Sequence, residues 1–167
     1  MTGPQKHRNL PGQGREDRLI RELVHDPYKL KFKYPEPTLC PGCGAVFDDG
    51  RWQWSTVPEG THEALCPACL RIRDKVPAAF LTVRGKFFQS HRDEIMHLIR
   101  NVEKKENQER PLERIMNMEE ADGELAVTFT DPHLARAVGE ALYHAYKGHL
   151  DYHYEKGEVL FRVRWER

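Results

Sequence analysis

The stretch Cys40-Pro-Gly-Cys43-Gly44, matched further along the chain by Cys66-Pro-Ala-Cys69, contains all four cysteines of the protein. The two Cys-x-x-Cys pairs are separated by 22 residues, which is the spacing of a four-thiolate zinc ribbon. Zinc takes four soft ligands at tetrahedral corners, and two residues between cysteines let a tight turn direct both sulfurs at one ion. Gly44 tolerates a positive φ, so the turn can point backbone N–H groups toward the thiolates. We therefore predict that Cys40, Cys43, Cys66 and Cys69 bind Zn²⁺.

The alternatives are two disulfides, or one redox-active pair beside a structural pair. Disulfides need an oxidising compartment, and the N-terminus has no pattern typical of an export signal. Neither cysteine pair lies in a βαβ pattern, which argues against a thioredoxin-like motif. We therefore expect reduced thiols and a cytoplasmic protein. A site closed by four cysteines leaves no ligand position for a substrate, so the expected role of the metal is structural.

Charge is distributed unevenly along the chain. Residues 1–92 contain 15 Lys and Arg against 10 Asp and Glu, whereas residues 93–167 contain 11 against 16. A basic half joined to an acidic half favours a protein with one surface that faces a polyanion. No apolar run approaches the roughly 20 residues of a transmembrane helix, so no membrane association is expected.

The chain divides by pattern into four parts. Residues 1–14 are rich in Gly, Pro and Gln and predict a mobile tail, and residues 15–37 predict a helix over 15–25 followed by a basic linker. Residues 38–75 form the expected ribbon, with a hairpin that turns at Asp48-Asp49-Gly50. Trp52 and Trp54 follow this turn. They are expected either to cover the small ribbon core, which we favour for at least one of them, or to stack on bases.

Residues 78–167 predict a second domain. Its expected order is a strand (80–84), a helix capped by Ser90 (to about 107), two strands (114–119 and 125–130), a helix that begins after Asp131-Pro132, and a final hairpin (150–155 and 159–165). The first six elements match the ferredoxin-like layout, with helices on one face of a sheet. The predicted fold class is thus α+β: a four-cysteine zinc ribbon followed by a ferredoxin-like domain, βαββαβ plus an extra strand.

Two sets of basic residues are candidates for RNA contacts. Six residues cluster between positions 71 and 92, with Asp74 as the one acidic residue among them: Arg71, Arg73, Lys75, Arg84, Lys86 and Arg92. On the final strand, Arg162 and Arg164 are expected to face outward beside His153, and Thr128 and Thr130 to face outward on a neighbouring strand. In each case an ordinary solvated surface is the alternative. The expected open sheet face lacks the aromatic pair with which RNA-recognition sheets stack bases.

No catalytic pattern is evident. The sequence contains no H-E-x-x-H helix and no phosphate-binding G-x-x-x-x-G-K-[ST] loop, so neither a metalloprotease nor a P-loop nucleotide site is predicted. The cysteines are assigned to metal, so no cysteine nucleophile remains. A hydrolase that uses His91 or His133 on RNA is the one catalytic hypothesis left, and we expect a protein that is not an enzyme and has no nucleotide cofactor.

Motifs along nearly the whole chain resemble a family of uncharacterised bacterial zinc-ribbon proteins, some of which carry the label ATPase. These motifs are Asp17-Arg-Leu-Ile-Arg-Glu22, His25-Asp-Pro-Tyr28, both cysteine pairs, Gly50-Arg-Trp52, His91-Arg92 and Thr130-Asp-Pro-His-Leu-Ala-Arg136. More remotely, the cysteine pairs followed by Thr130-Asp131, a helix and a Tyr-rich hairpin are similar to the large-ribosomal-subunit export adaptor family of archaea and eukaryotes. That similarity implies ribosome or ribosomal RNA binding and indicates no catalytic residues.

The sequence therefore predicts a cytoplasmic zinc-ribbon protein that binds RNA, with ribosomal RNA or the ribosome as its partner. The alternative is a zinc-stabilised adaptor that binds a protein partner through the ribbon and the helix containing Leu19, Ile20 and Leu23.

Overall fold

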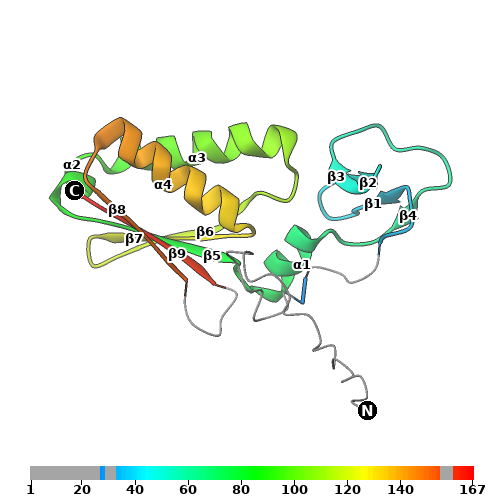
Figure 1. Ribbon diagram of the computed structural model, residues 1–167, viewed down its shortest axis with the longest axis horizontal. Coiled ribbons are helices and arrows are strands. Elements are labelled where there is room, and N and C mark those ends of the chain that lie inside the picture. The colour runs from blue at the N-terminus through cyan, green and yellow to red at the C-terminus, as the bar shows by residue number, and fades with distance from the viewer. Residues whose placement is uncertain (1–26, 29–32, 155–159) are drawn as a thin grey trace, which may run out of the picture.

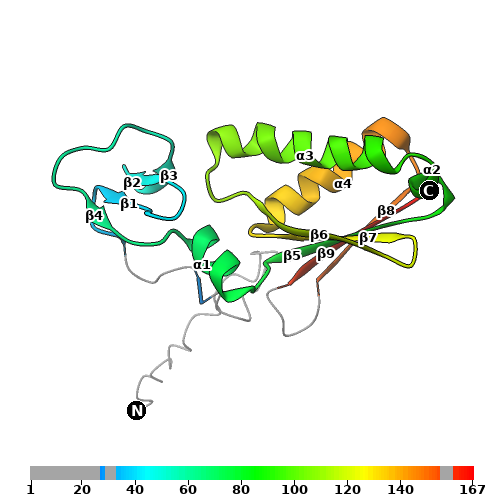
Figure 2. The same cartoon turned by 180° about the vertical axis from the view of Figure 1, so that it is seen from behind.

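The computed structural model describes residues 27–28, 33–154 and 160–167. Two lobes lie side by side, with the helix α1 (Pro67–Asp74) between them (Figure 1; Figure 2 gives the view from behind). The tail predicted over 1–14, the helix predicted over 15–25 and most of the basic linker lie outside the described residues. The protein is therefore a mixed α+β structure with two sheets, as the sequence predicted.

The smaller lobe is the ribbon. Its sheet has the order β3-β2-β1-β4, and its strands are β1 (Thr38–Leu39), β2 (Val46–Asp48), β3 (Arg51–Gln53) and β4 (His62–Glu63). The predicted hairpin joins β2 to β3, and both Asp49 (φ 52°) and Gly50 (φ 74°) take positive φ values at its turn. Such a turn matches the twist of the two strands it joins.

The aromatic side chains of the ribbon form its core. Trp52 is 8% exposed and packs edge-on against Tyr34, with ring centroids 5.1 Å apart, while Phe47 completes the cluster. Trp54 is 40% exposed instead. The expectation that at least one tryptophan covers the core is thus confirmed for Trp52. A sheet of strands this short has little else to bury.

The larger lobe is a five-stranded sheet covered on one face by two helices (Figure 1). Its elements are β5 (Ala79–Arg84), α2 (Lys86–Ser90), α3 (Arg92–Glu109), β6 (Ile115–Ala121), β7 (Glu124–Phe129), α4 (Pro132–Tyr146), β8 (His149–Tyr154) and β9 (Phe161–Glu166). Alternate residues of the central strands are buried beneath α3 and α4, as in β5, where Leu81 and Val83 are fully buried. This alternation is what a sheet with one covered face requires.

The ends of the helices agree only in part with the sequence prediction. The Asp131 side chain caps α4 by accepting a hydrogen bond from the His133 N–H at 2.7 Å, as predicted. Ser90 does not cap α3, because it ends the short helix α2 and its hydroxyl donates to the Lys86 carbonyl. Thr130 is buried, not outward-facing, and its hydroxyl donates to the Leu112 carbonyl at 2.6 Å.

The strand order β6-β7-β5-β9-β8 does not confirm the ferredoxin-like topology. A sheet built from the first six predicted elements would place β8 beside β5. Instead β9 pairs with β5 in parallel, and β8 lies at the edge. The physical reason is the difference in polarity between the two strands. The apolar residues Phe161, Val163 and Trp165 of β9 are all buried, so β9 takes the interior position, whereas the mostly polar β8 lies at the edge.

Candidate metal centre

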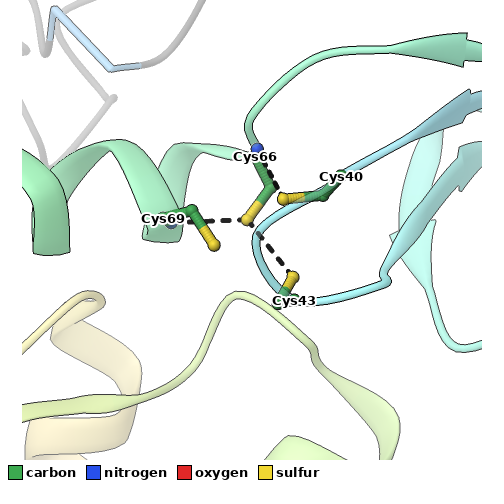
Figure 3. A group of neighbouring side chains, drawn as sticks. All are labelled: Cys40, Cys43, Cys66 and Cys69. Carbon is green, nitrogen blue, oxygen red and sulfur yellow. Dashed lines mark hydrogen bonds between the residues drawn. The ribbon is translucent and has the colours of Figure 1, made fainter.

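The first cysteine pair lies on a tight turn that follows β1. The Cys40 N–H donates to the Ala45 carbonyl at 2.8 Å, and the Gly44 N–H donates to the Cys40 carbonyl at 2.9 Å. Gly44 has φ +83°, so it reverses the chain where most side chains would be strained. The turn thereby directs the Cys40 and Cys43 side chains to the same side (Figure 3).

The second cysteine pair opens α1. Cys66 is the N-cap residue, and its sulfur accepts a hydrogen bond from the Cys69 N–H at 3.4 Å. Pro67 fits the first helical position, which needs no N–H donor. The positive end of the helix dipole favours negative charge here, which offsets part of the cost of burying a thiolate at this end of α1.

The two pairs meet across a gap of the size that one metal ion needs. All four sulfurs lie within 4.8 Å of one another, and the Sγ atoms of Cys43 and Cys66 are 3.8 Å apart. Four sulfurs at tetrahedral corners and at the usual Zn–S distance are also about 3.8 Å apart. None of the four cysteines forms a disulfide (Figure 3). The arrangement is therefore compatible with a metal ion such as Zn²⁺, and it contains the four residues that the sequence predicted.

Gly42 lets the two pairs approach each other this closely. A Cβ atom at this position would lie 2.9 Å from the Cys69 sulfur and 3.2 Å from the Leu65 side chain. Contacts this short would force the second pair away. The glycine inside the first Cys-x-x-Cys thus has a steric role in the site, which the spacing of the cysteines alone does not reveal.

The surroundings of the sulfurs shift the pKa values of the thiols in both directions. Burial alone would raise the pKa of Cys40, but backbone N–H groups of Cys66, Cys43 and Gly42 lower it to about 7. Burial raises the pKa of Cys43 and that of Cys66. Buried sulfurs that resist ionisation in the metal-free protein are thiolates only when a cation compensates their charge.

Arg114 is a functional residue that the sequence analysis missed. Its Nη2 atom donates to the Cys69 sulfur at 3.1 Å and lies 3.9 Å from the Cys66 sulfur. Four thiolates around a divalent ion would carry two excess negative charges, which this half-buried guanidinium would partly neutralise. Arg114 enters β6 and lies 45 residues after Cys69, so only the folded chain brings them together.

The segment that contains Arg114 also holds the ribbon against the larger lobe. The Trp54 ring N–H donates to the Asn107 carbonyl at 2.6 Å, and Leu112 packs against the ribbon core. The Arg114 N–H in turn donates to the Thr130 hydroxyl at 2.8 Å, which anchors the segment in the larger lobe. Residues 107–114 thus connect the metal centre to the five-stranded sheet.

The six basic residues predicted around residues 71–92 fall into two groups in the structure. Arg71, Arg73 and Lys75 lie in or just after α1, whereas Arg84, Lys86 and Arg92 lie at the far end of β5, near α2 (Figure 1). They therefore do not form one continuous patch.

Several of these side chains also have partners within the protein. Arg71 is 6% exposed and donates to the Val76 carbonyl at 3.2 Å. Arg73 pairs with Asp74, Arg84 with Glu166, and Arg92 with Glu120 and Asp93. RNA binding by these residues stays a prediction.

The sheet face opposite α3 and α4, here called the open face, carries one row of residues without an acidic side chain. The strand registers place the members of this row side by side across all five strands: Asn117, Thr128, Phe80, Arg162 and His153. The Arg162 guanidinium lies over the Phe80 ring, 4.9 Å from its centroid. Arg164 lies in the next row, between Thr82 and Asp151. The sequence analysis did not assign Phe80 to this face, because the facing of β5 depends on its pairing.

No protein-family model matches the chain, and comparison with curated proteins and with solved structures finds no match either. The resemblance drawn from the sequence motifs thus stays a prediction. Among the helices that the structure describes, each is too short or too polar to cross a membrane.

Proposed function

We propose that this protein is a non-catalytic RNA-binding protein in which Zn²⁺, held by the four cysteines, fixes the ribbon beside an RNA-binding sheet. We further propose a cytoplasmic location and ribosomal RNA as the partner. The observation that carries the proposal is the row on the open face in which Arg162 covers Phe80. A larger lobe with helices on one face and an open sheet on the other supports it, as in ferredoxin-like RNA-binding modules.

The row offers each contact that single-stranded RNA requires. The Arg162 guanidinium, which lies on the Phe80 ring, provides a flat cationic surface on which one base can stack and which attracts the phosphates. Asn117 and Thr128 supply polar groups for a ribose 2′-hydroxyl. Arg73 and Lys75 lie near the start of β5, where Phe80 also lies, so they extend the path of the RNA backbone toward the ribbon.

The test is the binding of fluorescently labelled single-stranded ribosomal RNA fragments, measured by anisotropy. Phe80→Ala should weaken binding by roughly tenfold to a hundredfold, because Arg162 loses the ring that holds it in place for stacking, and one base stack contributes about 1–3 kcal/mol. The logarithm of the affinity should fall linearly with the logarithm of the salt concentration, and Arg73→Ala with Lys75→Ala should flatten this slope. Arg100→Ala, an exposed arginine on α3, is the matched control. Salt-independent binding, or equal effects of Phe80→Ala and Arg100→Ala, would remove the proposal.

A protein-interaction adaptor is the second candidate, and exposed apolar side chains favour it. Trp54 and Val57 of the ribbon are 40% and 52% exposed, and Ile72 and Val76 around α1 are 40% and 42% exposed. In this role zinc would only fold the docking surface. Affinity capture with and without nuclease separates the two candidates, because partners that survive nuclease treatment favour the adaptor. Sedimentation with ribosomal particles that a chelator abolishes favours RNA binding.

A further inference from the structure

A second group of potential metal ligands includes Glu113, the residue that precedes Arg114 in the chain. It comprises Glu106 in the last turn of α3, Glu113 before β6 and His133 in the first turn of α4. One ligand atom from each residue lies within 4.8 Å of the other two. The side chains come from three separate elements, so the fold itself brings them together.

Glu113 is the unusual member of this group, because it is a carboxylate inside the protein. The residue is 5% exposed, and its Oε1 atom lies 3.2 Å from His133 Nδ1. Its Oε2 atom is buried and has no hydrogen-bond partner among the described residues. A buried carboxylate oxygen without a donor is costly, and a bound ion or water is one way in which a native structure satisfies such an atom.

Arg110 places a cationic nitrogen among the three side chains. Its Nη1 atom is 3.1 Å from Glu113 Oε1, 2.9 and 3.0 Å from His133 Nδ1 and Nε2, and 3.8 Å from Glu106 Oε2. One cationic nitrogen is thus close to a ligand atom of all three residues. The Arg110 side chain is 50% exposed and follows the last residue of α3, so it can rotate into solvent without disturbing the core.

We propose that Glu106, Glu113 and His133 form a second divalent-cation site, in which the Arg110 guanidinium takes the place of the ion when no metal is bound. This site is separate from the four cysteines and does not depend on RNA binding. One imidazole nitrogen and two carboxylates suit Mn²⁺, Fe²⁺ or Zn²⁺. Mg²⁺ and Ca²⁺ prefer oxygen ligands alone. His133 is 52% exposed, which gives an ion a path from solvent.

The test is a titration of the zinc-loaded, full-length protein with Mn²⁺, in which electron paramagnetic resonance measures the free ion. Mn²⁺ does not displace zinc from four thiolates, so the titration reports on the second site alone. We expect one saturable site per chain, lost in Glu113→Gln and in His133→Ala. Arg110→Met should bind Mn²⁺ about thirtyfold more tightly, because a divalent ion and a guanidinium about 4 Å apart repel each other even in water.

Two matched variants control for general effects of these substitutions. His144→Ala removes an exposed histidine from the same helix, and Glu109→Gln removes an exposed carboxylate from the end of α3; both should bind Mn²⁺ as the unmodified protein does. His133→Ala alters an exposed side chain, so it keeps the test valid even if Glu113→Gln does not fold. The proposal is overturned if neither the unmodified protein nor Arg110→Met shows saturable binding, or if His133→Ala binds as tightly as His144→Ala.

Discussion

Replacement of Arg114 by Met should weaken zinc binding at a site where none of the four sulfurs has been changed. The substitution removes the guanidinium that lies 3.1 Å from the Cys69 sulfur while it keeps a long side chain in the half-buried space. The thiolates then lose a charged hydrogen-bond donor, and their negative charge loses its nearest compensation.

The expected loss of zinc-binding free energy can be obtained in two ways. A hydrogen bond that involves a charged group contributes about 1.5–3 kcal/mol. Loss of a residue that orients metal ligands typically lowers metal affinity about 10- to 100-fold, which corresponds to about 1.4–2.8 kcal/mol. We therefore expect the dissociation constant for zinc to rise by one to two orders of magnitude.

The assay is competition for zinc against a chromophoric chelator, with Arg100→Met as the control because Arg100 is an exposed arginine on α3. Thermal unfolding with and without metal separates the effect on the site from a general loss of stability. Arg114→Met should lower the melting temperature of the zinc-loaded protein more than that of the metal-free protein. The reasoning is refuted if zinc affinity is the same in both variants, or if the metal-free protein is destabilised equally.

Three further predictions concern the lobes themselves. Removal of the metal by a chelator should expose Trp52 to water and shift its fluorescence to longer wavelength, because the ribbon has only a small core around the metal site. An unchanged spectrum would show that the ribbon folds without metal. Gly85→Ala should strongly lower the free energy of unfolding in denaturant, because Gly85 has φ +108° and a Cβ there would lie 2.3 Å from the Arg167 carbonyl oxygen. Gly60→Ala is the control and should cost much less, because Gly60 has φ +71° but open space around it. Equal losses in the two variants would contradict this prediction. Leu81→Ala should lower the free energy of unfolding by about 2–5 kcal/mol, since Leu81 is fully buried in the main core, and a loss below 1 kcal/mol would place it outside that core.

The cysteine site could be predicted because its information is local. Each Cys-x-x-Cys turn depends on neighbouring residues, and the hairpin at Asp49-Gly50 depends on turn chemistry that two residues encode. The capping of α4 by Asp131 is local in the same sense. The structure confirms the hairpin and the cap, and it brings the four cysteines together in an arrangement compatible with a metal ion.

The features that sequence analysis missed depend on contacts between distant segments. Arg114 meets Cys69 across 45 residues, and Glu113 meets His133 only because α4 begins beside the segment that precedes β6. The strand order was missed for a related reason. Periodicity indicates which face of β8 or β9 is buried, but the choice of the interior position depends on how the two compete for a place beside β5.

The most direct test of the account is zinc K-edge X-ray absorption on freshly purified, full-length protein, combined with elemental analysis. We predict one zinc per chain, bound by four sulfur atoms at about 2.3 Å. The Cys66→Ser variant should contain less zinc or none. Protein that contains no transition metal, or whose intact mass shows the four cysteines paired as disulfides, would contradict the claim that these sulfurs hold one ion.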